Sequence, residues 1–325
     1  MLKISYMYFL IILTLEFIEI QSLVLQECSD INVNNINKNI LLTLTKASIP
    51  ELEGKRKGEA GKIAVVGGSI EYTGAPYFAA LSALKVGADL VFVITTEDAA
   101  PVIKSYSPDL IVIPYSSKNI SSLLYSKDVI VLGPGLGREL EGLNLAYDVI
   151  NICKELKKPL VIDADGLYAV YKNISVIKNY PSPGAILTPN NAEAKRLKEA
   201  IPEADNQWYN FWGDYVTILE KGEADKYHSN LRKFDWFINE DGSGRRAGGQ
   251  GDILAGSLGT FLNWALKANL CENDQSVALA QSVASFAAAK FTRACNYKAF
   301  ELHGRSMIAS DMLNVIHPTF DNLYT

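Results

Sequence analysis

One short segment, residues 245–252, combines the residue types needed to hold an anion and to move a proton beside it. It has the sequence Arg-Arg-Ala-Gly-Gly-Gln-Gly-Asp and runs directly into an apolar, helix-like stretch at residues 253–259. Gly248, Gly249 and Gly251 let the backbone turn tightly and point several N–H groups at one spot. The following helix adds its unpaired N–H groups and the positive end of its dipole. The segment therefore predicts an anion-binding loop at a helix N-terminus.

Asp252 ends this loop, and a carboxylate at the rim of an anion site suits one chemical task. It could take a proton from a hydroxyl group that attacks a phosphoryl group held by the loop. The structural alternative is that Asp252 caps the helix, because Asp is a favoured N-cap and glycines often precede helices simply to form a turn. Both interpretations are open at this point.

The overall charge gives no reason to expect a polyanionic partner. The 325 residues carry a formal net charge of -5, so neither nucleic acid nor an anionic membrane is expected as a partner. Local basic pairs must therefore account for any anionic ligand. The four cysteines include no CxxC and the three histidines show no metal-ligand spacing, which disfavours a disulfide scaffold and a structural zinc site.

The N-terminal residues 1–47 are expected to form an extension, with the folded domain at residues 48–325. Residues 4–15 are an apolar run of the length found in signal peptides, and residues 32–39 are polar and Asn-rich, as in a linker. We expect a cytoplasmic location. The apolar run leaves a mitochondrial or signal-directed compartment as the alternative.

Short apolar strands alternate with helices over the rest of the chain. Strands are expected at residues 63–66, 90–94, 110–113, 128–132, 159–162, 185–187 and 216–219. Helices are expected at residues 76–86 and 143–156 and over most of residues 253–311. Continuous apolar strands separated by helices predict an α/β fold, with a mostly parallel central sheet covered on both faces. In such sheets the ligand site lies beyond the carboxyl ends of the strands.

Small, acidic or amide residues follow several of these strands, which favours one shared crevice. They stand at residues 67–68, 133–137, 163–166, 188–191 and 220–222. Gly133-x-Gly135-x-Gly137 does not have the spacing of a dinucleotide-binding fingerprint, and the chain contains no GxxxxGK[ST]. Any ATP would therefore bind in a non-Walker manner, on Gly248 to Gly251.

A longer series of motifs includes these segments. It consists of residues 57–63, 72–80, 105–108, 133–137, 161–166, 188–190, 221–223, 245–252 and 303–306. The series, in this order, resembles the ATP-dependent NAD(P)H-hydrate dehydratases of the ribokinase-like superfamily over about residues 50–325. The resemblance implies a three-layer αβα ribokinase-like fold. It also implies removal of the hydroxyl group from the S epimer of hydrated NADH or NADPH (NADHX or NADPHX), which gives NAD(P)H, ADP and phosphate.

The same resemblance implies roles for individual residues. Asp252 corresponds to the catalytic base, and ATP and Mg²⁺ are the implied cofactors. The implied ATP-binding residues are Lys221, Gly222, Glu223, Ala224 and Asp225, followed by Gly242, Ser243, Gly244, Arg245, Arg246, Ala247, Gly248, Gly249, Gln250 and Gly251. The implied substrate contacts are Gly137, Asn190, Asn191, Ala192, Glu193, Ala194, Lys195, Arg196 and Asp252.

Three assignments keep two interpretations each. Asn190-x-x-Glu193 fits the superfamily's NxxE pattern, which makes Glu193 a candidate Mg²⁺ ligand, although a first-turn acid also favours the helix dipole. Asp163 and Asp165 could be catalytic or could cap turns. One arginine of the pair at 245–246 is expected to bind phosphate, since arginine forks suit phosphate, while the other could face solvent.

The expected partners are NADHX or NADPHX and ATP, with a homo-oligomer and an NAD(P)HX epimerase left open. Two other functions compete. A ribokinase-like kinase of a small alcohol, such as a vitamin precursor, would keep Asp252 but lack the blocks at residues 72–80 and 105–108. A non-catalytic nucleotide-binding relative would not need Asp252 and Glu193.

Overall fold

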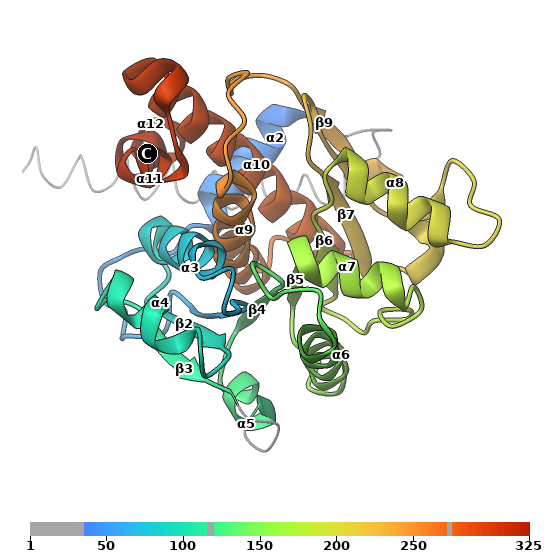
Figure 1. The fold of residues 1–325 in the computed structure, drawn as a ribbon. Coiled ribbons are helices and arrows are strands. Elements are labelled where there is room, and N and C mark those ends of the chain that lie inside the picture. The colour runs from blue at the N-terminus through green and yellow to red at the C-terminus, as the bar shows by residue number, and fades with distance from the viewer. Residues whose placement is uncertain (1–35, 116–119, 272–274) are drawn as a thin grey trace, which may run out of the picture.

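The computed structural model describes residues 36–115, 120–271 and 275–325. The apolar run at residues 4–15 and the first half of the Asn-rich stretch, residues 32–35, lie outside the described residues. A single sheet runs through the middle of the protein in the strand order β3-β2-β1-β4-β5-β6-β7-β8-β9 (Figure 1). Strands β1 to β7 pair in parallel, and β8 and β9 add two antiparallel strands at one edge. The mostly parallel sheet is confirmed.

All seven strands expected from the sequence are present within one or two residues. They are β1 (Lys62–Val66), β2 (Leu90–Thr95), β3 (Ile111–Pro114), β4 (Val129–Leu132), β5 (Leu160–Ile162), β6 (Ala185–Leu187) and β7 (Val216–Glu220). The edge strands are β8 (Asp225–His228) and β9 (Trp236–Ile238). The seven are identifiable because each is a continuous apolar run, as a strand buried on both faces requires.

Helices cover both faces of the sheet, which gives the three expected layers (Figure 1). Helices on the first face are α2 (Lys38–Ser48), α3 (Gly74–Val86), α4 (Ala100–Tyr106), α9 (Gln250–Lys267), α10 (Ser276–His303), α11 (Ala309–Asn314) and α12 (Ile316–Tyr324). Helices on the second face are α5 (Ile120–Tyr125), α6 (Leu140–Glu155), α7 (Ala164–Lys172) and α8 (Asn191–Ala200). Short 3₁₀ turns stand at Trp208–Trp212, Arg232–Phe234 and Gly304–Ser306.

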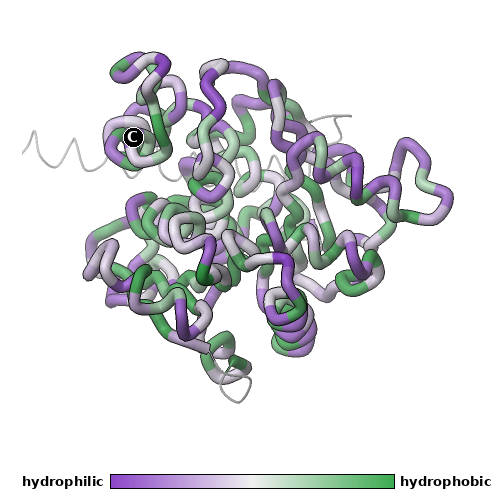
Figure 2. Tube along the Cα trace, viewed as in Figure 1, coloured by the Kyte–Doolittle hydropathy of each residue, from purple (hydrophilic) through white to green (hydrophobic). Residues whose placement is uncertain are grey.

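The core divides into two hydrophobic clusters, one on each side of the sheet. Ile63 and Val65 of β1 belong to the first cluster, and Ala64 and Val66 belong to the second, as the two-residue period of a strand requires. Hydrophobic residues gather in the central strands, whereas α8 and the loop after it are mostly hydrophilic (Figure 2). No helix in the described part of the chain is long and apolar enough to cross a membrane.

Residues 38–47, which their composition places in the extension, form most of helix α2 and belong to the packed core. The side chain of Asn37 caps this helix by accepting the N–H groups of Asn39 and Ile40. Leu41 and Leu44, three residues apart, are fully buried in the first cluster. The packed fold therefore begins before the expected boundary at Ser48. The apolar stripe of helix α2 is hard to identify in the sequence because polar Asn-rich residues precede it.

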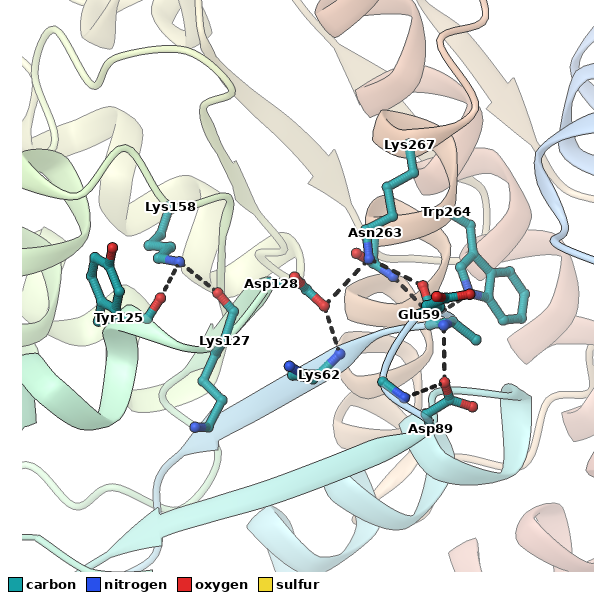
Figure 3. A network of polar contacts seen from close by, with 12 residues as sticks. Glu59, Lys62, Asp89, Tyr125, Lys127, Asp128, Lys158, Asn263, Trp264 and Lys267 are labelled. Carbon is teal, nitrogen blue, oxygen red and sulfur yellow. Dashed lines mark hydrogen bonds and ion pairs between the residues drawn. The ribbon is translucent and has the colours of Figure 1, made fainter. Parts of the chain in front are cut away.

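A polar network at the amino ends of the strands fixes the far end of α9 (Figure 3). The side chains of Asn263 and Trp264 both donate to the carbonyl of Ala60, just before β1. The ammonium of Lys267 lies 3.4 Å from a carboxylate oxygen of Asp128, at the start of β4. With its C-terminal end held here, α9 directs its N-terminus toward the carboxyl ends of the strands, where the site is expected.

Candidate active site

The glycine loop leads into α9, and its geometry requires glycine. Gly249 is the N-cap of α9 with a φ of 92°, in the left-handed region that other residues avoid. A Cβ at this position would lie 2.6 Å from Ala309 and 3.0 Å from the ring of Phe78. Asp252 is therefore the third residue of the helix, and the interpretation of Asp252 as the N-cap is wrong. Its carboxylate stands in the first turn, among the unpaired N–H groups of the helix.

Burial raises the pKa of Asp252 to about 7, and two nearby charges adjust it. The carboxylate of Asp163 raises the pKa further, and the ammonium of Lys221 lowers it. A carboxyl group whose pKa lies near neutral pH can accept a proton and release it again under physiological conditions. The role of Asp252 as a base, which the sequence predicts, requires this property.

Lys221 and Asp163 form a buried ion pair where two strands end. Nζ of Lys221, which follows β7, lies 2.6 Å from Oδ1 of Asp163, which follows β5. The hydroxyl of Thr188, after β6, donates to the same oxygen at 2.8 Å. Burial lowers the pKa of Lys221, but Asp163, Glu193 and Asp252 together raise it by more, so the net pKa is raised and the ammonium keeps its charge. Three strand ends thus meet in one crevice, as their sequences predict.

The two acids of the 163–166 turn have separate tasks. Asp163 stands at the N-cap position of α7 but makes no side-chain cap, because its carboxylate is turned to Lys221 and Thr188. Asp165 accepts the N–H of Gly137 and the Nε–H of Arg138, each at 3.0 Å. Asp165 therefore holds the loop after β4, and Asp163 belongs to the charged crevice.

A cleft of about 740 Å³ opens beside the N-terminus of α9. Most of the residues implied as ATP-binding line it, namely Lys221, Gly222, Glu223, Asp225, Gly242, Ser243, Gly244, Arg246, Ala247, Gln250 and Gly251. Ala224, Arg245, Gly248 and Gly249 are not among its lining residues. The two chain segments that the resemblance implies for ATP, which are far apart in sequence, therefore face one common space.

Helix α10 supplies three residues of this cleft that the sequence did not predict, Thr292, Arg293 and Asn296, and the last two make hydrogen bonds across it. Nη1 of Arg293 lies 3.4 Å from the carboxylate of Asp225, and Nη2 donates to the carbonyl of Glu223. Oδ1 of Asn296 accepts both the N–H and the hydroxyl of Ser243. Together they hold the two segments at a fixed separation. The sequence shows only that Arg293 and Asn296 are three residues apart and so share one face of the helix.

The residues implied as substrate contacts are divided between two places. Asn190, Asn191 and Ala192 line the large cleft. Glu193 and Arg196 instead line a small adjoining hollow. The remaining members line neither space: Gly137, whose N–H is bound to Asp165, the buried Ala194, Lys195, which pairs with Glu199, and Asp252.

The Asn190-x-x-Glu193 pattern forms a capping box at the start of α8. The side chain of Asn190 accepts the N–H groups of Ala192 and Glu193, and the carboxylate of Glu193 accepts the N–H of Asn190 at 2.9 Å. Burial raises the pKa of Glu193, while this hydrogen bond and Lys221 lower it. The structural alternative for Glu193 is thus realised, and its carboxylate still lies close enough to Lys221 and Asp163 to interact with them.

The described residues fit a Mg²⁺ ion that arrives with phosphate. In that part of the chain, no three His, Cys, Asp or Glu side chains are grouped closely enough to hold a metal ion by themselves. Mg²⁺ usually keeps several waters and binds through one or two carboxylates plus the phosphates of its ligand. Glu193 and Asp163 supply carboxylate oxygens of that kind beside the crevice.

Comparison with known proteins agrees with this geometry. The family model for NAD(P)H-hydrate dehydratase matches residues 63–317. The ATP-dependent (S)-NAD(P)H-hydrate dehydratase of Aedes aegypti is 48% identical over 294 residues, which cover 89% of this chain and 86% of the relative. The Homo sapiens protein of the same name is 42% identical over 298 residues, which cover 87% of this chain and 84% of the relative.

Solved structures show which known fold this chain shares. The Bacillus subtilis ADP/ATP-dependent NAD(P)H-hydrate dehydratase, co-crystallised with ATP and Mg²⁺, has a TM-score of 0.63 at 20% identity. The match covers 86% of this chain and 96% of that one. Giardia lamblia ribokinase has a TM-score of 0.54 at 12% identity and covers 81% and 99%. These likenesses confirm the ribokinase-like fold, and the family model and the curated relatives show that the chain belongs to the NAD(P)H-hydrate dehydratase family.

Proposed function

We propose that this chain uses ATP to dehydrate the S epimer of NADHX or NADPHX, giving NAD(P)H, ADP and phosphate. The observation that carries the proposal is the position of Asp252. It stands in the first turn of α9, beside the glycine loop, with a pKa raised to about 7. The names of the relatives at 42% to 48% identity support the choice of substrate.

In the proposed reaction Asp252 takes the proton of the ring hydroxyl group. The hydroxyl oxygen attacks the γ-phosphorus of ATP, and ADP leaves with the electrons of the broken P–O bond. Hydroxide is a poor leaving group and phosphate a good one, so the C–O bond of the phosphorylated ring then breaks. Phosphate leaves with the electrons of that bond, the adjacent carbon loses a proton to water, and the ring double bond is restored. Mg²⁺ bound to the ATP phosphates would reduce their negative charge.

The protein's part is to hold the phosphates and orient the hydroxyl group. We place the transferred phosphoryl group on the N–H groups of residues 248–251 and beside the Lys221 ammonium, where donors are fixed before reaction. The rest of ATP occupies the large cleft, whose walls Arg293 and Asn296 hold in place. The hydrated ring faces Asp252 from the side of Gly137.

The competing function is phosphorylation of a small alcohol, because kinases share this fold. The two are separated by their products. Purified protein with ATP, Mg²⁺ and hydrated NADH should restore the absorbance of reduced nicotinamide and release one free phosphate for each NADH formed. Transfer of phosphate to a vitamin alcohol, without any gain of NADH absorbance, would establish the kinase. Inactivity toward both, with ATP still bound, would support the non-catalytic relative.

An NAD(P)HX epimerase is the proposed functional partner, since it would convert the R epimer into the S epimer used here. A homo-oligomer and a cytoplasmic location belong to the same proposal. Size-exclusion chromatography with light scattering tests the first, and localisation of the tagged full-length chain tests the second.

A further inference from the structure

A second cleft, of about 580 Å³, lies next to the large one. Its lining residues are Gly244, Arg245, Arg246, Phe300 and Arg305. Gly244 and Arg246 also line the large cleft, so the backbone around them is a wall between the two spaces. Arg245, Phe300 and Arg305 line only the second cleft.

No acidic side chain in the described ranges balances the positive charge of the arginines that line the second cleft. No carboxylate lines it. The acids on nearby helices have other partners, since Glu301 lies 3.8 Å from the ammonium of Lys298 and Asp311 lies 3.6 Å from His303. Among the described residues, no ion pair includes any of the three arginines at positions 245, 246 and 305. In a chain of net charge -5, three such guanidinium groups around one space call for an anionic ligand.

The arginines are positioned by the backbone. Nε and Nη1 of Arg245 donate to the carbonyls of Met307 and Arg246, which leaves Nη2 for a ligand. Gly304, with a φ of 54°, ends α10 and turns the chain so that Arg305 follows in a short 3₁₀ turn. Phe300, one turn before the end of α10, is 36% exposed and offers a flat apolar surface at the same cleft.

The second cleft is built on the backbone that carries the catalytic helix. Arg245 is bonded to the carbonyl of Met307, and Ala309 packs so closely on Gly249 that only glycine fits there. Gly249 is the N-cap of the helix that bears Asp252. The wall of the second cleft is therefore packed against the N-terminus of the helix that bears Asp252.

We propose that the second cleft binds phosphate groups of the dinucleotide substrate, with Arg245 and Arg305 as the main contacts and Phe300 packing on a ring or ribose beside them. This inference rests on the proposed function and assigns Arg245 to the substrate instead of ATP. The Arg305 guanidinium, which has no partner among the described residues, can bind phosphate through two parallel hydrogen bonds, and Nη2 of Arg245 can donate one more.

The experiment measures steady-state kinetics with hydrated NADH and hydrated NADPH on Arg305→Gln and Arg245→Gln. Arg305→Lys keeps the charge without the fork and should fall between wild type and Arg305→Gln. Arg56→Gln, an exposed arginine before β1, is the matched control. The side chain of Arg305 makes no hydrogen bond within the described residues, so its substitution should leave the fold intact. The two Gln variants should raise the KM for the dinucleotide about tenfold, with kcat and the KM for ATP within twofold of wild type.

Two patterns support the proposal and identify the phosphate. An equal rise for both hydrates indicates the diphosphate, and a rise for hydrated NADPH alone indicates the 2′-phosphate. A rise confined to the KM for ATP, or unchanged KM values for both substrates, would overturn it. Calorimetric titration of wild type and Arg305→Gln with NADPH keeps the test independent of turnover. If wild type fails to dehydrate either hydrate, the proposed function fails, while weaker NADPH binding by Arg305→Gln would still support the subsite.

Discussion

The ammonium of Lys221 lies 2.6 Å from the Asp163 carboxylate, and this ion pair stands directly beside the first turn of α9. A Cβ on Gly251 would come within 3.2 Å of Nζ of Lys221 and 3.8 Å of Oδ2 of Asp163. The absence of a side chain at Gly251 therefore lets the helix N-terminus and the lysine face one point. Positive charge and N–H donors converge there, and Asp252 lies close enough for both charged groups to shift its pKa.

Breaking this ion pair should cost stability as well as activity. Lys221→Met leaves the buried Asp163 carboxylate without its partner, and we expect a loss of about 3 kcal/mol in the free energy of unfolding. Lys221→Met/Asp163→Asn should recover part of that loss, because no charge is then left buried. Urea unfolding of the single and double variants measures the coupling. Additive losses in the double variant would show that the two groups do not interact.

Activity should depend on pH through Asp252. Because its pKa is raised to about 7, the base is protonated and inactive at lower pH. We expect kcat/KM for the hydrated dinucleotide to fall about tenfold per pH unit below that value, since kcat/KM reports the free enzyme. A profile flat from pH 5.5 to 8, with saturating ATP, would contradict the assignment of Asp252 as base.

Because its pKa is raised, Asp252 should lower the free energy of unfolding at high pH. The folded chain holds this proton up to about pH 7, whereas the unfolded carboxyl releases it near its ordinary value of 3.8. Stability is therefore lost as pH rises between these values and stays low above them. Asp252→Asn removes the cost, so its Tm relative to wild type should increase by a few degrees between pH 5 and pH 8. An equal Tm difference at both pH values would argue against a buried ionising Asp252.

The glycines of the loop should differ sharply in their tolerance of alanine. Gly249→Ala meets both a left-handed φ and Ala309, and we expect a loss of about 2 kcal/mol in the free energy of unfolding. Gly251→Ala should cost little stability but raise the KM for ATP several-fold, because its methyl group, 3.2 Å from Nζ of Lys221, shifts the ammonium by a few tenths of an ångström. Gly248→Ala is the control, since open space surrounds it and its N–H remains. Chemical unfolding and ATP kinetics on the three variants test this order.

The layers of the fold were predictable because buried parallel strands are continuous apolar runs that need no partner to be identified. The contacts between residues of the site were less predictable from the sequence. Lys221 and Asp163 are 58 residues apart, and their meeting depends on the order of β5, β6 and β7 in the sheet, which the strand patterns do not contain. Asp252 was predicted as base or N-cap, but the helix start is fixed by the packing of Gly249 on Ala309, a residue 60 positions later in a different helix.

The residues that shape the site were the hardest to predict. Arg293 and Asn296 act through backbone carbonyls, an amide and a hydroxyl of distant loops, and no local pattern encodes such contacts. Asn190 and Glu193 are the opposite case, in which a local sequence pattern does predict a contact. They form a capping box and also stand beside the crevice.

The most direct test compares wild type with Asp252→Asn in the dehydration of hydrated NADH by ATP and Mg²⁺. Wild type should restore the absorbance of reduced nicotinamide. Asp252→Asn should lose about a thousandfold in kcat, which is within the range expected for loss of a general base. Calorimetry should show ATP binding within about threefold of wild type. Turnover by Asp252→Asn within tenfold of wild type would contradict the claim that this carboxylate, on this helix, is the base of the reaction.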